Sequence, residues 1–398
     1  MVFYRRIRKR APAPAPAPAV DPEPTIQTYK TEGSLSPYAE TIVSPLAAKT
    51  ISYDSDFYSK VYNYPVSTLK PVIAVISLGG GLFGSINKLT GILTGGDCQT
   101  YWSSIGIPAA RQSTVMVIPV AGATNKPNAK DAGYTAENCL NVQILGSNCP
   151  GSTILVFLAP LTYDGFYQAF KSAINGNVVI NGRRVSPSVI SCSWGGIEKS
   201  WSPYDLNRFN ALFGVAVSKG INICCATGNS GSSNGGVGNN VDFPSCSPNV
   251  IACGGTTLKC PSLKYDATTT EVAWSSGGGG MSAVFNAPSF QVTTLKATKR
   301  RVPDIALNAD PKTGIKIMVN GQITVVGGTS AVAPAVSAFI GRAGITKFLP
   351  PTLYTIRYPT RCFHDVKSGS NGAFTAVAGY DFCTGLGSID GTAIKANL

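Results

Sequence analysis

The sequence predicts an α/β protein with a doubly wound, mainly parallel sheet that carries helices on both faces. Apolar runs of strand length recur along the chain, several of them closed by glycines, and helical patterns lie between them. These runs are apolar at nearly every position, which is typical of strands that are buried on both faces. Because crossover helices connect parallel strands, the alternation favours a seven-stranded, mainly parallel sheet.

The expected strands and helices alternate from about residue 50. The strands are expected at 71–81, 113–122, 152–160, 186–196 and 220–231, and the helices at roughly 134–147, 163–175 and 203–219. In sheets of this kind, ligand chemistry lies at the carboxyl ends of the strands. A functional site is therefore expected among the loops 77–81, 193–196 and 227–231 and the segment around Gly-Gly-Thr-Ser.

The N-terminal segment differs in composition from the rest of the chain. We assign residues 1–49 to a basic, Ala/Pro-rich disordered arm and linker, and residues 50–398 to one domain. The Ala-Pro alternation predicts an extended spacer, because proline fixes φ and removes N–H donors. Ahead of it stand the cationic side chains of Arg5, Arg6, Arg8, Lys9 and Arg10. They indicate binding to nucleic acid or another anionic partner, or else a solubilising tail, and both interpretations stay open.

Composition excludes several classes of site. Of the 398 residues, 44% are hydrophobic and 13% charged, so most of the chain can bury a core. Lys and Arg total 33 against 20 Asp and Glu, and the resulting net charge of +13 permits a polyanionic partner. The sequence has one histidine, His364. Metal sites built from several histidines are therefore excluded, and a Ser-His-Asp triad would have to run through this residue.

The eleven cysteines show no zinc-finger spacing, and several lie in apolar, strand-like runs. We therefore expect reduced, buried thiols, while a Cys362–Cys383 bridge stays open. No apolar run approaches the roughly 18 residues that cross a bilayer. The N-terminus is charged where a signal peptide is apolar. We expect an intracellular protein, in the cytoplasm or nucleus, or one inside a virion assembled there.

Three local patterns carry side chains suited to catalysis. Ser330 follows two glycines at an expected helix start, where N–H groups and the helix dipole favour negative charge. An ordinary helix cap is the alternative. Asn229 lies on a glycine-flanked loop and can donate to an oxyanion or simply form a turn. Glu137 and Asn141 are four residues apart in a helical stretch, so both project from one face.

Together and in this order, these segments resemble the sedolisin (serine-carboxyl peptidase) family, whose fold is subtilisin-like. The family's Gly-Thr-Ser-Ala-x-x-Pro element matches Gly328–Pro334, and its Ser-x-Ser-Trp-Gly strand end matches Ser191–Gly195. Its Glu helix with the following Gly-x-x-x-Pro-Gly turn matches Glu137–Gly151. Further matches are LGGG (78–81), AGATN (121–125), VDFP (241–244), ACGGT (252–256), VPDIALNADP (302–311) and PTLY (351–354). The similarity runs from about residue 50 to the C-terminus.

The resemblance implies a nucleophile at Ser330 and a general base at Glu137. Where the family has an Asp that supports the Glu, this chain has Asn141, and where it has an oxyanion Asp, this chain has Asn229. Ser77 stands where a further Glu of the network is frequent. Three acidic positions are therefore neutral. The family also carries a long folded prosegment, which the roughly 50 residues ahead of the similarity are too few to form.

The resemblance also implies one structural calcium ion. The family's calcium loop matches Asp365–Val366 and Gly379–Ser388. The implied ligands are the carboxylates of Asp365 and Asp381 and the backbone carbonyls of Val366, Val377 and Gly379. Such oxygen ligands suit Ca²⁺, whereas two Asp residues that cap turns are the alternative.

Three further residues or runs receive simpler interpretations. His364, beside the calcium loop, is expected to be a bystander rather than a ligand. The resemblance implies that Trp194 packs beside Glu137 in the cleft wall. The basic run of Lys299, Arg300 and Arg301 is expected to form a solvated loop.

Two interpretations of the altered site stay open. In the first, it is retuned for neutral pH, because Asn229 donates at any pH and Asn141 orients Glu137. In the second, it has decayed, because a carboxylate base that loses its supporting carboxyl is weakened. The sequence thus predicts a calcium-stabilised, sedolisin-like serine endopeptidase homologue with weak, full or lost activity. The alternative class is an inactive structural or interaction protein with a nucleic-acid-binding basic arm, associated with a virion.

Overall fold

The computed structural model describes residues 26–28, 35–37, 40–42, 51–128, 132–176, 178–180, 183–357 and 361–398. Across these residues, the central sheet has seven parallel strands in the order β7 (Thr114–Pro119), β8 (Thr153–Ala159), β4 (Val72–Leu78), β11 (Val189–Cys192), β13 (Asn222–Ala226), β15 (Ile251–Lys259) and β19 (Ile305–Asn308). Three antiparallel strands extend its edges, namely β16 (Thr270–Ala273), β6 (Ile92–Thr94) and β5 (Ser85–Ile86). The prediction of a mainly parallel sheet is confirmed.

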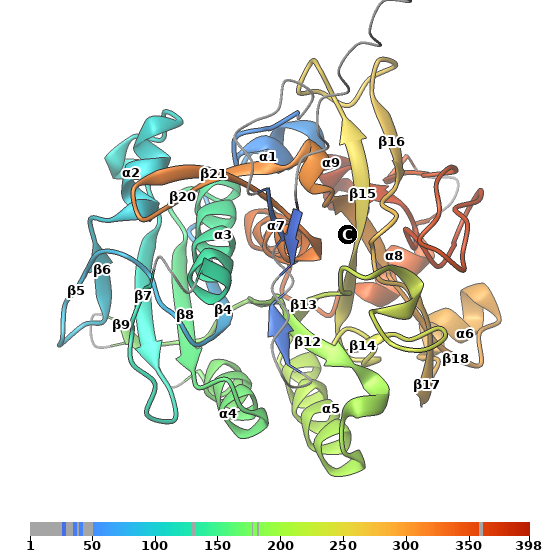
Figure 1. Cartoon of the computed structure of the whole chain (residues 1–398), viewed down its shortest axis with the longest axis horizontal. Helices are drawn as coiled ribbons and strands as arrows, with labels where there is room; N and C mark the ends of the chain where they lie inside the picture. Colours follow the sequence, from blue (N-terminus) through green and yellow to red (C-terminus); the bar gives the residue numbers. More distant parts are fainter. Residues whose placement is uncertain are drawn as a thin grey trace, which may run out of the picture.

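Helices cover both faces of this sheet (Figure 1). One face carries α3 (Ala132–Asn148) and α7 (Thr329–Ala343), and the other carries α4 (Tyr163–Asn175) and α5 (Pro203–Ser218). In β4, Ile73 and Val75 join the hydrophobic cluster that includes α3 and α7, whereas Ala74 and Ile76 join the cluster that includes α4 and α5. Because successive residues of a strand point to opposite faces, the apolar run of β4 is buried on both.

Local signals set the ends of α4 and α5. The Thr162 hydroxyl caps α4 by accepting a hydrogen bond from the Gly165 N–H at 3.0 Å, and Gly176 ends the helix with a φ of +62°. The Ser202 hydroxyl caps α5 by accepting a hydrogen bond from the Asp205 N–H at 3.0 Å. Pro203 follows it at the first helical position, where a missing N–H costs no helical hydrogen bond.

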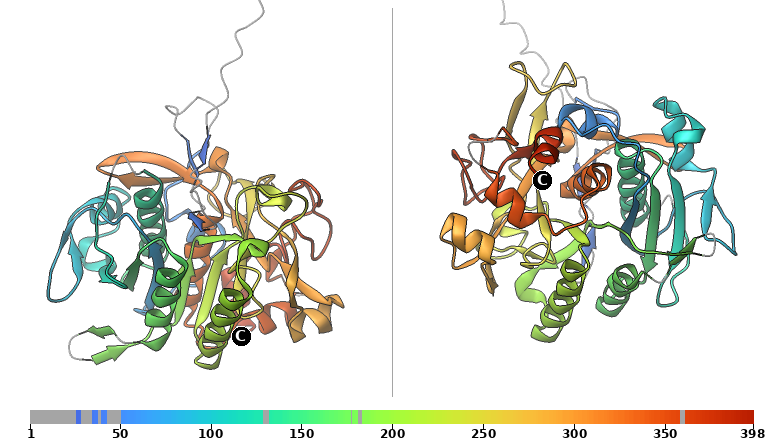
Figure 2. Two further views of the ribbon diagram at one scale, coloured as in Figure 1. Left: turned by 60° about the horizontal axis from the view of Figure 1, so that its bottom comes forward. Right: turned by 180° about the vertical axis from the view of Figure 1, so that it is seen from behind.

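Shorter elements complete the fold (Figure 2), and the β20–β21 hairpin among them contacts α3. The helices are α1 (Phe57–Val61), α2 (Asp97–Ser104), α6 (Ser289–Leu295), α8 (Pro350–Thr355) and α9 (Gly391–Ala396). The strands are β9 (Val178–Ile180), β10 (Arg183–Val185), β12 (Trp194–Ile197), β14 (Asp242–Phe243), β17 (Gly280–Asn286), β18 (Lys299–Val302), β20 (Ile315–Val319), β21 (Gln322–Gly327), β22 (Phe363–His364) and β23 (Ser388–Ile389). None of the helices in the described ranges combines the length and apolar character that a bilayer crossing requires.

Three short strands precede the domain predicted at 50–398. β3 (Glu40–Ile42) pairs with β21 and with β1 (Ile26–Thr28), and β2 (Ser36–Pro37) pairs with β12. The prediction of a disordered linker is therefore wrong for these strands, because β2 and β3 pair with strands of the domain and β1 pairs with β3. The basic residues from Arg5 to Arg10 and the Ala-Pro tract lie outside the described residues, and the anionic partner stays a prediction.

The basic run at 299–301 is not a solvated loop, and that expectation is wrong. Arg300 lies on β18 with no exposed side-chain surface, and its guanidinium donates to both carboxylate oxygens of Asp304 at 2.6 Å. Asp304 also accepts from the Ala252 N–H at 2.7 Å and from the Tyr354 hydroxyl at 2.8 Å. A buried charge pair of this kind persists because every polar atom has a partner.

Replacing Asp304 should show how much the buried Arg300–Asp304 pair contributes to stability. We expect Asp304→Asn to lower the free energy of unfolding by about 3–5 kcal/mol, because the Arg300 charge stays buried without its partner. Asp164→Asn is the control, since the Asp164 side chain is 70% exposed in its pair with Arg208 and should cost about 0–1 kcal/mol. Urea unfolding of both variants measures the difference, and equal losses would contradict it.

Candidate active site

Ser330 lies at the start of α7, which contacts the segments that follow β11 and β13. β21 leads into the helix through Gly328, whose φ of +102° favours glycine. The Ser330 hydroxyl donates a hydrogen bond of 2.8 Å to Oε2 of Glu137 on α3, which is 193 residues away in the sequence. Both side chains are fully buried.

Asn141 lies one turn after Glu137 on α3 and binds the other oxygen of the same carboxylate. Its Nδ2 donates to Oε1 of Glu137 at 2.5 Å and to the Glu137 backbone carbonyl at 2.7 Å. The carboxylate therefore accepts hydrogen bonds from both the Ser330 hydroxyl and the Asn141 amide. These hydrogen bonds hold the carboxylate between the Ser330 hydroxyl and the Asn141 amide.

Ser193 completes the network and was not singled out from the sequence. Its hydroxyl lies 2.8 Å from Oδ1 of Asn141 and 3.2 Å from the Ser330 carbonyl oxygen, and it donates to both acceptors. In a regular helix that carbonyl would accept from the N–H four residues later, but this residue is Pro334, which has none. Ser193 thus orients the Asn141 amide and satisfies the carbonyl of the candidate nucleophile.

Asn229 lies beside the residue that precedes Ser330. Its Oδ1 accepts hydrogen bonds from the Thr329 N–H and the Thr329 hydroxyl, each at 2.9 Å. The Thr329 hydroxyl also accepts from the Gly228 N–H at 3.1 Å, which joins this loop to the start of α7. The amide oxygen therefore faces Thr329, and the amide nitrogen is the donor end of the same side chain.

The remaining predicted residues of the cleft are also brought to this region. Trp194 stacks on Tyr134 of α3, three residues before Glu137, with ring centroids 5.8 Å apart. Ser77 is buried at the carboxyl end of β4, and within the described ranges its hydroxyl has no hydrogen-bond partner. Ser191 on β11 is in the same situation.

The two predicted calcium carboxylates converge on one turn. Asp365 accepts a hydrogen bond from the Gly379 N–H at 3.1 Å, and Asp381 accepts one from the Val377 N–H at 3.2 Å. Burial raises the pKa of Asp381 above its usual value, so a nearby cation would offset the cost of its charge. Val366 is buried between these loops.

The carboxylates and backbone carbonyls predicted for this turn are oxygen ligands, the type that Ca²⁺ binds. In the part of the chain that is described, no cluster of three or more His, Cys, Asp or Glu side chains surrounds a point. A metal would therefore bind two carboxylates and backbone carbonyls, which are the oxygen ligands that Ca²⁺ takes.

The single histidine packs against an aromatic ring, and none of the cysteines forms a disulfide. The His364 ring stacks on Tyr265 with centroids 3.5 Å apart, and burial lowers its pKa. All eleven cysteines are free and buried. The Cys362–Cys383 bridge that the sequence left open is therefore not formed, and burial raises the pKa of the Cys383 thiol to about 11.

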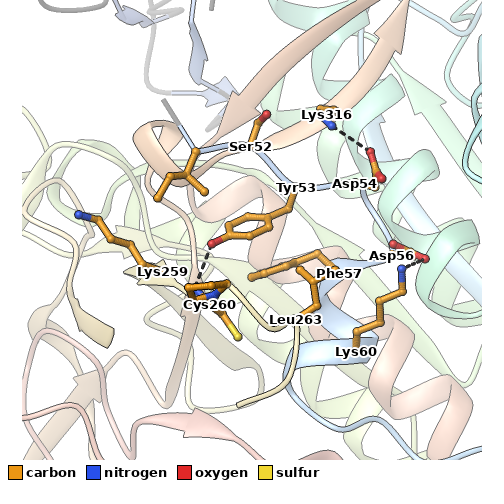
Figure 3. Close-up of a pocket in the computed structure, with 12 residues that line it drawn as sticks. Ser52, Tyr53, Asp54, Asp56, Phe57, Lys60, Lys259, Cys260, Leu263 and Lys316 are labelled. Atoms are coloured by element: carbon orange, nitrogen blue, oxygen red, sulfur yellow. Dashed lines mark hydrogen bonds and ion pairs between the residues drawn. The ribbon is translucent and has the colours of Figure 1, made fainter. Parts of the chain in front are cut away.

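A pocket of about 460 Å³ opens elsewhere on the molecule (Figure 3). Tyr53 stacks on Phe57 at its floor, with ring centroids 4.0 Å apart, and the Tyr53 hydroxyl accepts from the Cys260 N–H. Lys316 pairs with Asp54 at 3.3 Å across its rim. Because the pocket shares no lining residue with the Ser330 network, it is not the candidate active site.

Comparisons with known proteins identify several that are similar to this chain. The subtilase family model matches residues 120–345. Kumamolisin from Bacillus sp. (strain MN-32) is 36% identical over 343 residues, covering 79% of this chain and 58% of kumamolisin. Sedolisin from Pseudomonas sp. (strain 101) is 29% identical over 358 residues, covering 78% of this chain and 58% of sedolisin. The chain therefore spans little more than half the length of these relatives.

A solved structure supports the same relationship. The structure of Pseudomonas sedolisin, a serine-carboxyl proteinase complexed with two molecules of pseudo-iodotyrostatin, superposes with a TM-score of 0.72. Its sequence is 25% identical, and the match covers 87% of this chain and 98% of that one. The subtilisin-like fold, the order of the motifs and these relatives lead to one conclusion: the chain belongs to the subtilase family, as a member of its sedolisin group.

Proposed function

We propose that this chain is a serine-type endopeptidase in which Ser330 attacks the scissile carbonyl and Glu137 takes the serine proton. The observation that carries the proposal is the 2.8 Å hydrogen bond from the Ser330 hydroxyl to the Glu137 carboxylate. This distance lies within the reach that proton transfer between a nucleophile and its base requires. The serine-carboxyl proteinase named among the similar structures gives the same reaction class independent support.

The proposed reaction has two halves. Attack by Oγ of Ser330 forms the C–O bond of an acyl-enzyme, and Glu137 passes the proton to the leaving amine as the C–N bond breaks. Water then hydrolyses the ester while Glu137 again acts as base. The Ser330 N–H at the start of α7 and the Asn229 amide are the proposed oxyanion donors. Each donor of this type is worth about 100- to 1000-fold in rate.

Asn141 supports an active site that works near neutral pH. An amide donates to Glu137 without a titrating proton, whereas two adjacent carboxyl groups hydrogen-bond only when they share one. With Ser193 holding the amide oxygen, the amide nitrogen is presented to Glu137. We therefore propose that the neutral residues retune the site rather than abolish its chemistry.

The dyad can be tested with an active-site probe. We expect a fluorophosphonate to label the unmodified chain at pH 7 and not Ser330→Ala, because only an activated serine hydroxyl reacts. Glu137→Gln should lower kcat/KM for a peptide by at least ~10³-fold, because the base is lost. Ser337→Ala on the same helix is the matched control, since the Ser337 hydroxyl donates to the Ala333 carbonyl and not to the dyad. Equal labelling of the unmodified chain and Ser330→Ala at every pH from 4 to 8 would leave a non-catalytic protein.

The neutral-pH proposal predicts the effect of restoring a carboxyl. Asn141→Asp should move the optimum of kcat/KM to lower pH by about 1–3 units, because the Asp–Glu hydrogen bond forms only when the pair holds a proton. Asn175→Asp adds the same charge at an exposed position on α4 and should leave the optimum in place. The pH profiles of the three proteins decide the matter, and an unchanged optimum in Asn141→Asp would rule out this role for the amide.

We also propose that one calcium ion is held by Asp365, Asp381 and the backbone carbonyls of Val366, Val377 and Gly379. When bound, the ion would neutralise the two carboxylates and stabilise the C-terminal loops. Removing it with EGTA should lower the free energy of unfolding by about 3 kcal/mol when free calcium had been about 100 times its Kd. Asp381→Asn should make the thermal unfolding midpoint insensitive to EGTA, whereas Asp266→Asn, on an exposed loop, should retain the sensitivity. If EGTA leaves the unfolding of the unmodified chain unchanged, the two Asp residues cap turns and do not bind calcium.

A further inference from the structure

The pocket of Figure 3 has a floor of two stacked aromatic rings. Tyr53 and Phe57 are both buried, and their rings lie nearly parallel, with an interplanar angle of 25°. The Tyr53 hydroxyl is used by the backbone of the neighbouring strand end. It donates to the Leu258 carbonyl at 3.5 Å and accepts from the Cys260 N–H at 3.0 Å. The floor therefore offers a ligand an apolar surface.

Backbone hydrogen bonds hold one wall of the pocket in place. The Tyr53 N–H donates to the Gly314 carbonyl at 2.9 Å, and the Lys316 N–H donates to the Tyr53 carbonyl at 2.8 Å. The Ile51 N–H donates to the Lys312 carbonyl at 3.2 Å. Because β20 fixes this segment before any ligand arrives, little conformational entropy is lost on binding.

Charged side chains of opposite sign stand at the two ends of the pocket. Lys259 lies on one side of Tyr53, and Asp54 and Asp56 lie on the other side (Figure 3). Among the described residues, the Lys259 side chain forms no ion pair and no hydrogen bond. Asp56 pairs with Lys60 at 2.7 Å, and Asp54 pairs with Lys316 at 3.3 Å.

The ion pairs at the acidic end leave room for a second cation. The side chain of Asp54 is 48% exposed, as is that of Lys60, and ion pairs at such exposed positions are weak. A carboxylate also has acceptor positions for more than one donor. An ammonium group of a ligand can therefore bind at this end beside the lysines.

The size and the charge pattern of the pocket together define the ligand. Its volume of about 460 Å³ falls within the range of pockets that bind small molecules. A fatty acid would supply a partner for Lys259 but none for the acidic end, and an apolar amine would do the reverse. A free dipeptide carries both charges with apolar side chains between them, and it spans at most about 7 Å when extended.

We propose that this pocket binds a short free peptide with apolar side chains, such as a dipeptide. Its carboxylate pairs with Lys259, its ammonium group with Asp54 and Asp56, and its side chains contact Tyr53 and Leu263. This inference goes beyond the proposed endopeptidase function and does not rest on it, because no residue of the Ser330 network lines the pocket.

Isothermal titration calorimetry with the dipeptide Leu-Leu tests the ligand class. The full chain is used with Ser330→Ala, so that no turnover disturbs the measurement. We expect saturable binding at pH 7 with a Kd below about 10 mM. Acetylating the amino end or amidating the carboxyl end should each weaken binding about 3- to 5-fold, because each change removes one rim ion pair.

Two rim variants locate the charges of the ligand. Lys259→Gln should weaken binding of Leu-Leu and abolish the difference between Leu-Leu and its amide, because the partner of the carboxylate is gone. Asp54→Asn should reduce the difference between Leu-Leu and its acetylated form. Lys264→Gln and Asp164→Asn are the matched controls, since both side chains are exposed and neither lines the pocket.

A third variant tests the apolar wall. Leu263 has a φ of +53–55°, a conformation that Asn tolerates, so Leu263→Asn removes apolar surface without straining the backbone. It should weaken binding of Leu-Leu at least ~3-fold. Leu89→Asn is its control, because Leu89 is 97% exposed and lies outside the pocket. Thermal unfolding of every variant confirms that the domain stays folded.

Three results would overturn the inference. Absence of saturable binding up to about 10 mM would show that the pocket takes no such peptide. Binding that is unchanged in Lys259→Gln, Asp54→Asn and Leu263→Asn would place the peptide elsewhere on the chain. If the acetylated or the amidated peptide binds as tightly as Leu-Leu, the ligand needs only one of its charges, and the proposed class is wrong.

Discussion

The hydrogen bond between the Ser330 hydroxyl and the Glu137 carboxylate is the contact on which the whole site depends, and the fold is what makes it form. The two residues are 193 positions apart and lie on α7 and α3, which pack on the same face of the central sheet. Parallel strands end at one edge, so the helices and loops that follow them meet there. Ser330 comes within reach of Glu137 because Gly328 turns the chain sharply from β21 into α7.

Much of this arrangement could be predicted from the sequence. The parallel strands β4, β7, β8, β11 and β13 fall within their expected ranges because fully buried strands leave long apolar runs. The caps of α4 and α5 are local signals. The prediction that Arg300 lies in a solvated loop was wrong because its burial depends on partners that come from several other elements. The pairing of β2 and β3 was missed for a related reason, since two- and three-residue strands carry almost no pattern of their own.

Replacing an aspartate by an asparagine changes more than charge at position 141. A carboxylate presents only acceptors, whereas an amide has one accepting end and one donating end, so its orientation matters. The Ser193 hydroxyl settles that orientation by donating to the oxygen, and the nitrogen then meets Glu137. The sequence could identify the substitution but not its partner, because Ser193 is 52 residues from Asn141 and follows β11, whereas Asn141 lies on α3.

The proline in α7 has a mechanical consequence. Without an N–H at residue 334, the carbonyl of Ser330 must find its donor outside the helix, and Ser193 has a single hydroxyl hydrogen for that carbonyl and for Asn141 together. The two acceptors therefore draw on the same proton. A small rotation about the Ser193 Cβ–Oγ bond would strengthen one of these two hydrogen bonds and weaken the other. The position of the Ser330 backbone and the orientation of the Asn141 amide are therefore coupled.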